Sequence, residues 1–241
     1  MYKKRRILSV IPARGGSKGL KRKNVRLLSG LPLIAWTIEA ARNSRYIDRV
    51  IVSTEDSKIA RLASKFGAEV PFLRPARLSG DRAALTDVVL DVLDKLADSD
   101  RGWDYVILLQ PTSPLRTSGD IDAAVEKFFS CKNADAIISV TEVAENPFAM
   151  QRITREGFLE DILPGGKNIH RRQDMPAIYK MNGAIYICKT EVLRRDGTFC
   201  PGKTIAFKMP GDRSVDVDDA QDLKEAGKFI KEMRQRKGRR S

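Results

Sequence analysis

The chain has 241 residues, of which 42% are hydrophobic, and a formal net charge of +13 at pH 7. This is enough to bury the core of one large domain, alone or with an appendage. One histidine and three widely spaced cysteines give little support to a histidine-rich metal site or a Ser-His-Asp triad. The cysteines form no CxxC pair and suit a reduced, cytoplasmic setting, and no apolar stretch is long enough to cross a membrane.

The positive charge indicates an anionic partner, either nucleic acid or a polyphosphate substrate. The chain lacks Arg-Gly repeats, zinc-finger spacing and an aromatic RNP motif, so a nucleic-acid-binding module is the weaker alternative.

Apolar strand patterns alternate with helical patterns through the first 143 residues. We expect strands at 7–13, 48–55, 68–74, 105–110 and 134–143, and helices at 32–44, 57–67, 86–97 and 120–131. The strands lack polar alternation, which predicts an α/β fold: a mostly parallel, Rossmann-like sheet with helices on both faces. Ligands bind at the carboxyl ends of such strands, so the loops after Ala13, Thr54 and Gln110 should share one mouth.

The alternation stops between residues 142 and 180. Residues 152–163 read as a hairpin with Glu156-Gly157 at its turn, and the α/β pattern resumes at 182–189. We interpret 142–180 as a small dimerisation subdomain inserted in a single nucleotidyltransferase domain that spans 1–241. An ordinary surface insertion fits the pattern equally well.

A glycine-rich basic loop, IPARGGSKGLKRKN, follows the first strand. Its glycines allow backbone amides to approach phosphate oxygens, and Arg14, Lys18 and Lys23 supply countercharge. The spacing matches neither the P-loop nor G-x-G-x-x-G, and a basic surface loop is the alternative.

Valine and aspartate alternate in the segment SVDVDD near the C-terminus. In an extended chain Asp216 and Asp218 project to the same side, where two carboxylates could hold Mg²⁺. Helix capping is the alternative, and we assign that role to Asp219 and Asp222, at the start of the helical segment AQDLKEAGKFIKEM.

Two further motifs carry polar groups next to strands. In LLQPTSPLRTSGDI, Gln110 would present its amide at a strand end, although the motif could be a rigid turn and nothing more. In RRQDMPAIYKMNGAIYI, Arg171 and Arg172 could bind a carboxylate, with a basic loop beside a core tyrosine as the alternative. A phosphate-binding loop, a divalent-cation site and an anion clamp together indicate nucleotidyl transfer.

The segments ARGGSKGL-x-x-KN, LLQPTSPLRT, RRQD-x-P…NGAIYI and the late D-x-D together resemble the CMP-acylneuraminate (CMP-sialic acid) synthetases, a family of cytidylyltransferases. The resemblance covers residue 7 to about 230. It implies that CTP and a nine-carbon 2-keto sugar acid give the CMP-sugar and pyrophosphate, in a Mg²⁺-dependent homodimer, by direct attack of the sugar's C2 hydroxyl on the α-phosphate. The general base stays open between Asp216 and a metal-bound hydroxide.

The resemblance also implies a role for each matching residue. Arg14, Lys23 and Asp216 form the expected catalytic set, and Asp216 and Asp218 the metal ligands. Arg74 matches a position beside the cytosine and Tyr186 a wall of the N-acyl pocket. The expected CTP-binding residues are Arg14, Gly15, Ser17, Lys23, Asn24, Arg74 and Asp81. The expected sugar-binding residues are Gln110, Arg172, Gln173, Asn182 and Tyr186, with Arg172 and Gln173 reaching the partner subunit's site.

Two departures leave the sugar open. Ala149 stands where some members carry a lysine that faces the sugar, and Leu85 where some carry a serine near the ribose. Legionaminic and pseudaminic acids share the nine-carbon frame and are alternatives to N-acetylneuraminic acid. The Kdo cytidylyltransferases have a different first loop, so Kdo is a weaker alternative.

Overall fold

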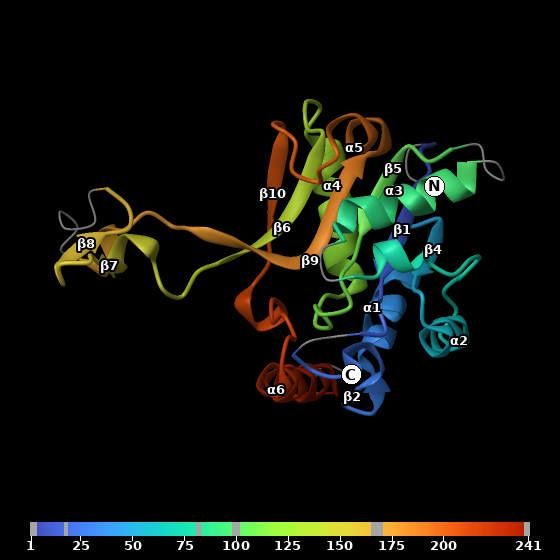
Figure 1. The fold of residues 1–241 in the computed structure, drawn as a ribbon, viewed down its shortest axis with the longest axis horizontal. Helices are drawn as coiled ribbons and strands as arrows, with labels where there is room; N and C mark the ends of the chain where they lie inside the picture. The colour runs from blue at the N-terminus through green and yellow to red at the C-terminus, as the bar shows by residue number, and fades with distance from the viewer. Residues whose placement is uncertain (1–3, 17–18, 81–82, 98–101, 165–170, 239–241) are drawn as a thin grey trace.

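The protein is described by a computed structural model that covers residues 4–16, 19–80, 83–97, 102–164 and 171–238 (Figure 1). Its centre is a six-stranded sheet of order β10-β6-β9-β5-β1-β4. The strands are β1 (Ile7–Pro12), β4 (Arg49–Ser53), β5 (Tyr105–Leu108), β6 (Ala136–Glu142), β9 (Tyr179–Lys189) and β10 (Thr204–Lys208). β1 runs parallel to β4 and β5, and β6 parallel to β10, whereas β9 lies antiparallel between β5 and β6. The predicted mostly parallel sheet is confirmed.

Helices cover both faces of the sheet, as the unbroken apolar strands require. One apolar cluster joins the sheet to α1 (Leu33–Arg42), α2 (Ser57–Lys65) and α4 (Ser118–Ser130). A second cluster joins the sheet to α3 (Leu85–Ala97) and α5 (Thr190–Asp196). The long helix α6 (Ala220–Gly238) packs instead against Leu28, Leu33 and Leu115, beside the short hairpin of β2 (Leu27–Leu28) and β3 (Leu31–Pro32).

The strand predicted at 68–74 is wrong. In its place the chain makes one isolated parallel bridge, between Ile51 and Glu69, and then continues without pairing. Pro71 lacks the N–H that a strand would need at this position, which explains the early end of the pairing. Short 3₁₀ helices fill several loops, at Lys23–Val25, Ala76–Leu78, Pro147–Ala149, Arg172–Asp174 and Gly211–Arg213.

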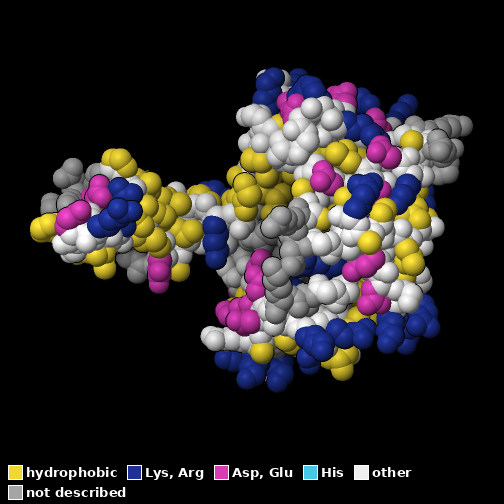
Figure 2. Space-filling view, viewed as in Figure 1, with side chains coloured by type: hydrophobic (Ala, Val, Ile, Leu, Met, Phe, Trp, Pro, Cys, Tyr) yellow, Lys and Arg dark blue, Asp and Glu magenta, His cyan; other side chains and the backbone are white. Residues whose placement is uncertain are grey.

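The segment between β6 and β9 projects from the body as an arm (Figure 1). At its end β7 (Gln151–Ile153) pairs with β8 (Leu159–Asp161), and Gly157 adopts a φ of 89° in the turn, so the predicted hairpin is confirmed. The arm exposes large apolar side chains, which Figure 2 shows along its surface. They include Ile153, Phe158, Leu159 and Ile162.

Among the described residues, no helix combines the length and the apolar character needed to span a bilayer.

Candidate active site

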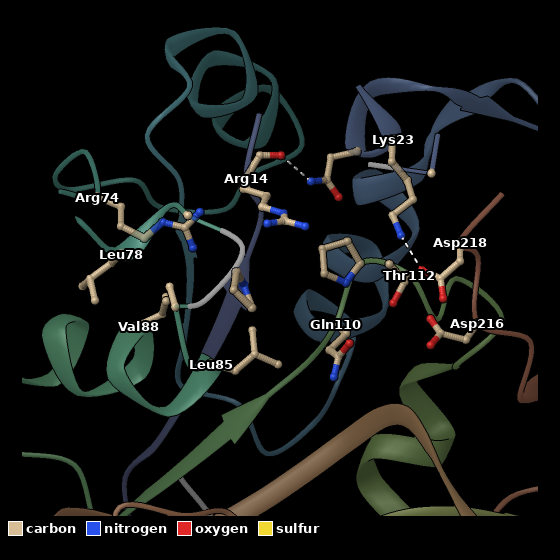
Figure 3. Close-up of a pocket in the computed structure, with 16 residues that line it drawn as sticks. Arg14, Lys23, Arg74, Leu78, Leu85, Val88, Gln110, Thr112, Asp216 and Asp218 are labelled. Atoms are coloured by element: carbon tan, nitrogen blue, oxygen red, sulfur yellow. Dashed lines mark hydrogen bonds and ion pairs between the residues drawn. The ribbon is translucent and has the colours of Figure 1, made fainter. Parts of the chain in front are cut away.

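A cavity of about 440 Å³ is lined by the loops after β1 and β5, by α3 and by the segments around Arg74 and Asp216. The prediction that the loops after Ala13 and Gln110 share one mouth is confirmed, whereas the loop after β4 contacts the loop after β1 through Glu55 and does not line the cavity. The cavity brings together residues from four parts of the chain that the sequence analysis had singled out, namely Arg14, Lys23, Asn24, Arg74, Gln110, Asp216 and Asp218 (Figure 3).

The basic loop after β1 is held by its own side chains and by the D-x-D segment. Asn24 is buried, and its Nδ2 donates to the carbonyl oxygen of Arg14 at 2.9 Å. Lys23 Nζ lies 2.8 Å from Asp218 Oδ1. Gly19 packs so closely against this segment that a Cβ atom there would lie 2.5 Å from the backbone oxygen of Asp218. The basic loop and the D-x-D segment are therefore in direct contact.

The D-x-D segment presents its carboxylates to the cavity, as the alternating pattern predicts. Val217 is fully buried, and its N–H donates to the carbonyl oxygen of Thr112 at 2.8 Å, which joins this segment to the loop after β5. Asp216 and Asp218 flank it and line the cavity. Partial burial against the cavity walls raises the pKa of Asp216, and the charge of Asp218 raises it further.

Asp219 and Asp222 cap α6, which confirms the capping role predicted for these two acids. Asp219 Oδ1 accepts from the N–H groups of Gln221 and Asp222, and Asp222 Oδ2 accepts from those of Asp218 and Asp219.

Glu55 is a residue of the site that the sequence interpretation missed. Its Oε1 accepts from the Gly15 N–H at 2.7 Å, and its Oε2 accepts from Arg74 Nη2 at 2.8 Å. Burial alone would raise the pKa of Glu55, but these two hydrogen bonds outweigh it and hold the pKa below its usual range. Its place just after β4, in a loop expected at the mouth, was the signal that could have found it.

Arg74 forms one end of the cavity together with apolar side chains. It is 5% exposed, and Leu78, Leu85 and Val88 lie beside it. Figure 3 shows Arg74 reaching in from one side, Lys23 and the Asp216/Asp218 pair on the opposite side, and Arg14 between them. One end can thus contact a flat apolar group, and the other can bind a polyanion with a cation.

The loop that carries Gln110 is organised from behind by a buried arginine. Arg116 Nη1 donates to the carbonyl oxygens of Gln110, Ser113 and Ala184 at 3.4, 3.2 and 3.0 Å. Burial lowers the pKa of Arg116 to about 9. The loop is therefore fixed to β9, and Gln110 lines the cavity as predicted.

The other predicted residues lie outside the cavity lining of the described chain. The N–H of Gly15 is taken by Glu55. Asn182 is buried, and its amide binds Ser139 and Ser214, which links β6 and β9 to the chain before the D-x-D segment. Tyr186 packs against Phe199 with ring centroids 6.1 Å apart.

Four predicted residues remain. Ser17 and Asp81 lie outside the described residues. Arg172 and Gln173 belong to the 3₁₀ helix Arg172–Asp174 in the segment between β8 and β9, where Gln173 is exposed.

Asp216 and Asp218 are the residues that could hold a metal ion. The described part of the chain contains no cluster of three or more histidine, cysteine or acidic residues suited to a metal. A two-carboxylate site suits Mg²⁺, which is commonly held by one or two carboxylates together with substrate phosphates.

Comparison with known proteins agrees with this site. The family model described as "Cytidylyltransferase" matches residues 8–224. The chain is 36% identical over 218 residues to an N-acylneuraminate cytidylyltransferase of Streptococcus agalactiae, covering 90% of this chain and 51% of that protein. It therefore spans about half the length of that relative. It is 38% identical over 216 residues to a CMP-N,N'-diacetyllegionaminic acid synthase of Legionella pneumophila, covering 88% of this chain and 91% of that protein.

The fold is similar to that of a solved CMP:2-keto-3-deoxy-manno-octonic acid synthetase complexed with CTP. The TM-score is 0.71 and the identity 17%, and the match covers 95% of this chain and 99% of that one. At this identity the likeness concerns the fold alone.

Proposed function

We propose that this chain, which belongs to the cytidylyltransferase family, transfers CMP from CTP to the C2 hydroxyl of a nine-carbon 2-keto sugar acid. N-acetylneuraminic acid is the leading acceptor, and legionaminic, pseudaminic and Kdo acids are the alternatives. The observation that carries the proposal is the contact between the basic loop and the carboxylate pair, with Lys23 Nζ 2.8 Å from Asp218 Oδ1 at the cavity wall.

The reaction requires alignment and charge neutralisation more than covalent chemistry from the protein. The sugar oxygen forms a bond to the α-phosphorus while the bond to the β-phosphate oxygen breaks, and pyrophosphate leaves with the electron pair. Arg14 and Lys23 neutralise the triphosphate, and Arg74 binds the cytosine with the apolar side chains beside it. Asp216 is a candidate general base for the proton of the C2 hydroxyl, and the identity of the base stays open.

Asp216 and Asp218 would hold Mg²⁺. Both residues line the cavity, so phosphate oxygens can complete the coordination. When bound, the ion would supply positive charge to the phosphates and stabilise the departing pyrophosphate.

On the acceptor side, Gln110 orients the sugar from the loop after β5. Arg172 binds the sugar carboxylate and Gln173 lies beside it, from the arm of a second copy of the chain in a homodimer. Asn182 and Tyr186 act from β9. Tyr186 forms a wall of the acyl pocket, and Asn182 supports the site through Ser214, its partner at 2.9 Å.

Pyrophosphate release tests the proposal. The protein is incubated with Mg²⁺, each of the four nucleoside triphosphates, and N-acetylneuraminic, legionaminic, pseudaminic or Kdo acid. We expect release with CTP and one nine-carbon acid. Release with another nucleotide, or no release with any pair from folded protein, would contradict it.

A further inference from the structure

Glu55 occupies a place that none of the expected roles covers. It follows β4 behind the cavity lining, and each of its two carboxylate oxygens binds a different part of the site. One oxygen accepts from the backbone of the basic loop at Gly15, and the other from the side chain of Arg74. We propose that Glu55 is a positioning residue that couples nucleobase recognition at Arg74 to the placement of the phosphate-binding loop. This inference rests on the proposed use of CTP.

Glu55 holds the side chain of Arg74 in place. The guanidinium is buried, and a buried charge needs a partner. Glu55 is the partner of Nη2, and the Arg74 backbone N–H is also fixed, by the carbonyl oxygen of Thr54 at 2.8 Å. Arg74 Nε is buried without a hydrogen-bond partner among the described residues. Glu55 thus fixes the orientation of a guanidinium whose residue lines the cavity.

That orientation bears on the choice of base. Cytosine presents two adjacent acceptors, O2 and N3, whereas uracil carries a hydrogen on N3. A guanidinium held in one orientation donates to both cytosine atoms but meets a donor on uracil. If the guanidinium were free to turn, the discrimination between the two bases would weaken.

Glu55 also holds the start of the basic loop, at Gly15. The Gly15 N–H points to Glu55 Oε1, so this amide is not directed at a phosphate. The neighbouring residue Asp56 closes the contact, because a Cβ atom on Gly15 would lie 2.7 Å from Asp56 Oδ2. Glu55 therefore fixes the start of the loop that carries Arg14 and Lys23.

Direct binding of nucleotides tests the coupling without any knowledge of the sugar. The affinities of the wild-type protein and its variants for CTP and UTP are measured by titration calorimetry with Mg²⁺. Glu55→Gln retains the shape but replaces one acceptor by a donor. We expect it to weaken CTP binding about tenfold or more, as for a lost charge-assisted hydrogen bond, and to narrow the preference for CTP over UTP. Glu55→Asp keeps the charge and should restore most of the preference.

The matched control is Glu69→Gln. Glu69 also pairs with an arginine, Arg49, at 2.7 Å, but lies exposed at the outer edge of the sheet, so CTP affinity and preference should stay at wild-type values. Thermal melting establishes that each variant is folded.

A second comparison separates the contact of Glu55 with Arg74 from its contact with the basic loop at Gly15. Glu55→Ala should weaken CTP binding further in an Arg74→Met background, because the loop contact is lost as well. No further loss would mean that Glu55 acts through Arg74 alone and would overturn the coupling, as would equal weakening of CTP and UTP by Glu55→Gln. A wild-type protein that binds no CTP would instead overturn the proposed function itself.

Discussion

Lys23 and Asp218 lie 195 positions apart in the chain, yet their charged atoms are 2.8 Å apart. Asp218 is 76% exposed, and an ion pair this accessible to water contributes little to stability. Its significance is placement, because it brings a cation that suits phosphate next to a carboxylate that suits a metal ion.

At the residue scale the metal assignment predicts a sharp contrast between neighbouring acids. Asp216→Ala should lower kcat by about a hundredfold or more, because metal-ion stabilisation is worth several kcal/mol and about 1.4 kcal/mol is tenfold. Asp219→Ala should instead cost about 1 kcal/mol of stability through loss of the α6 cap, with kcat retained. Turnover and chemical denaturation of both variants check this, and wild-type turnover in Asp216→Ala would refute the metal site.

Two glycines of the basic loop provide another contrast. Gly19→Ala places a methyl group 2.5 Å from the backbone oxygen of Asp218, so the loop or the D-x-D segment must shift. A displacement of roughly 1 Å can cost about a hundredfold in rate, and we expect kcat/KM for CTP to fall about 10- to 100-fold. At Gly16 an added Cβ meets no described atom within 4 Å, so Gly16→Ala is the control. Equal kinetics for the two variants would contradict this account.

The sequence predicted these residues unevenly. The period-two alternation around Val217 was enough to place Asp216 and Asp218 on one side of the chain. Glu55 and Arg116 carry no comparable local pattern, because their roles depend on partners far away in the sequence. Glu55 meets Gly15 across 40 positions, and Arg116 meets Ala184 across 68.

At the scale of elements, the loop from Gln110 to Arg116 is the support of the site. It meets the D-x-D segment through Thr112 and Val217, and it meets β9 through Arg116. Arg213 adds an ion pair with Asp120 at the start of α4, with Nη2 2.8 Å from Oδ1. The loop and the D-x-D segment are thus held by separate contacts, the loop to β9 and the D-x-D segment to the loop and to α4.

Arg116→Ala should destabilise the protein strongly. It removes the donor to three carbonyl groups and leaves a cavity, which we expect to cost about 3 kcal/mol. For a chain of this size the melting temperature should fall by about 6 to 12 °C. Arg152→Ala, which breaks an exposed ion pair with Glu160 on the arm, is the control and should change it little. Similar melting temperatures for both variants would show that Arg116 is dispensable.

The order of most elements could be predicted because apolar strands and amphipathic helices alternate clearly. The strand at 68–74 was wrong because Val70 and Phe72 pack against the core without strand pairing, and Pro71 prevents continued pairing. The antiparallel insertion of β9 between β5 and β6 was not predictable, since strand order depends on long-range packing rather than on local pattern. α5 and β10, which follow β9, were not predicted either.

At the scale of the whole molecule, the arm carries apolar side chains that the described structure leaves uncovered. Ile153 is 74% exposed and Phe158 72% exposed, and large exposed apolar patches commonly mark interfaces. We expect a homodimer in solution at micromolar concentration, formed through these side chains. The double substitution Ile153→Asp and Phe158→Asp should give a folded monomer by light scattering.

The control for this prediction is Leu27→Asp. Leu27 is also well exposed, at 66%, but lies on the β2–β3 hairpin of the body, so its replacement should leave the dimer intact. A wild-type monomer would contradict the dimer, and a dimer that survives the double substitution would place the interface elsewhere.

The position of β9 affects how the chain folds while it is being made. β5 and β6 leave the ribosome first, but the strand that lies between them is synthesised only after the entire arm, a delay on the order of seconds. Until then each has an unpaired edge, and unpaired edges invite association with other chains. The length of the arm therefore sets how long those edges stay unpaired. A longer arm would prolong their exposure, and a shorter arm would raise the yield of folded protein during expression.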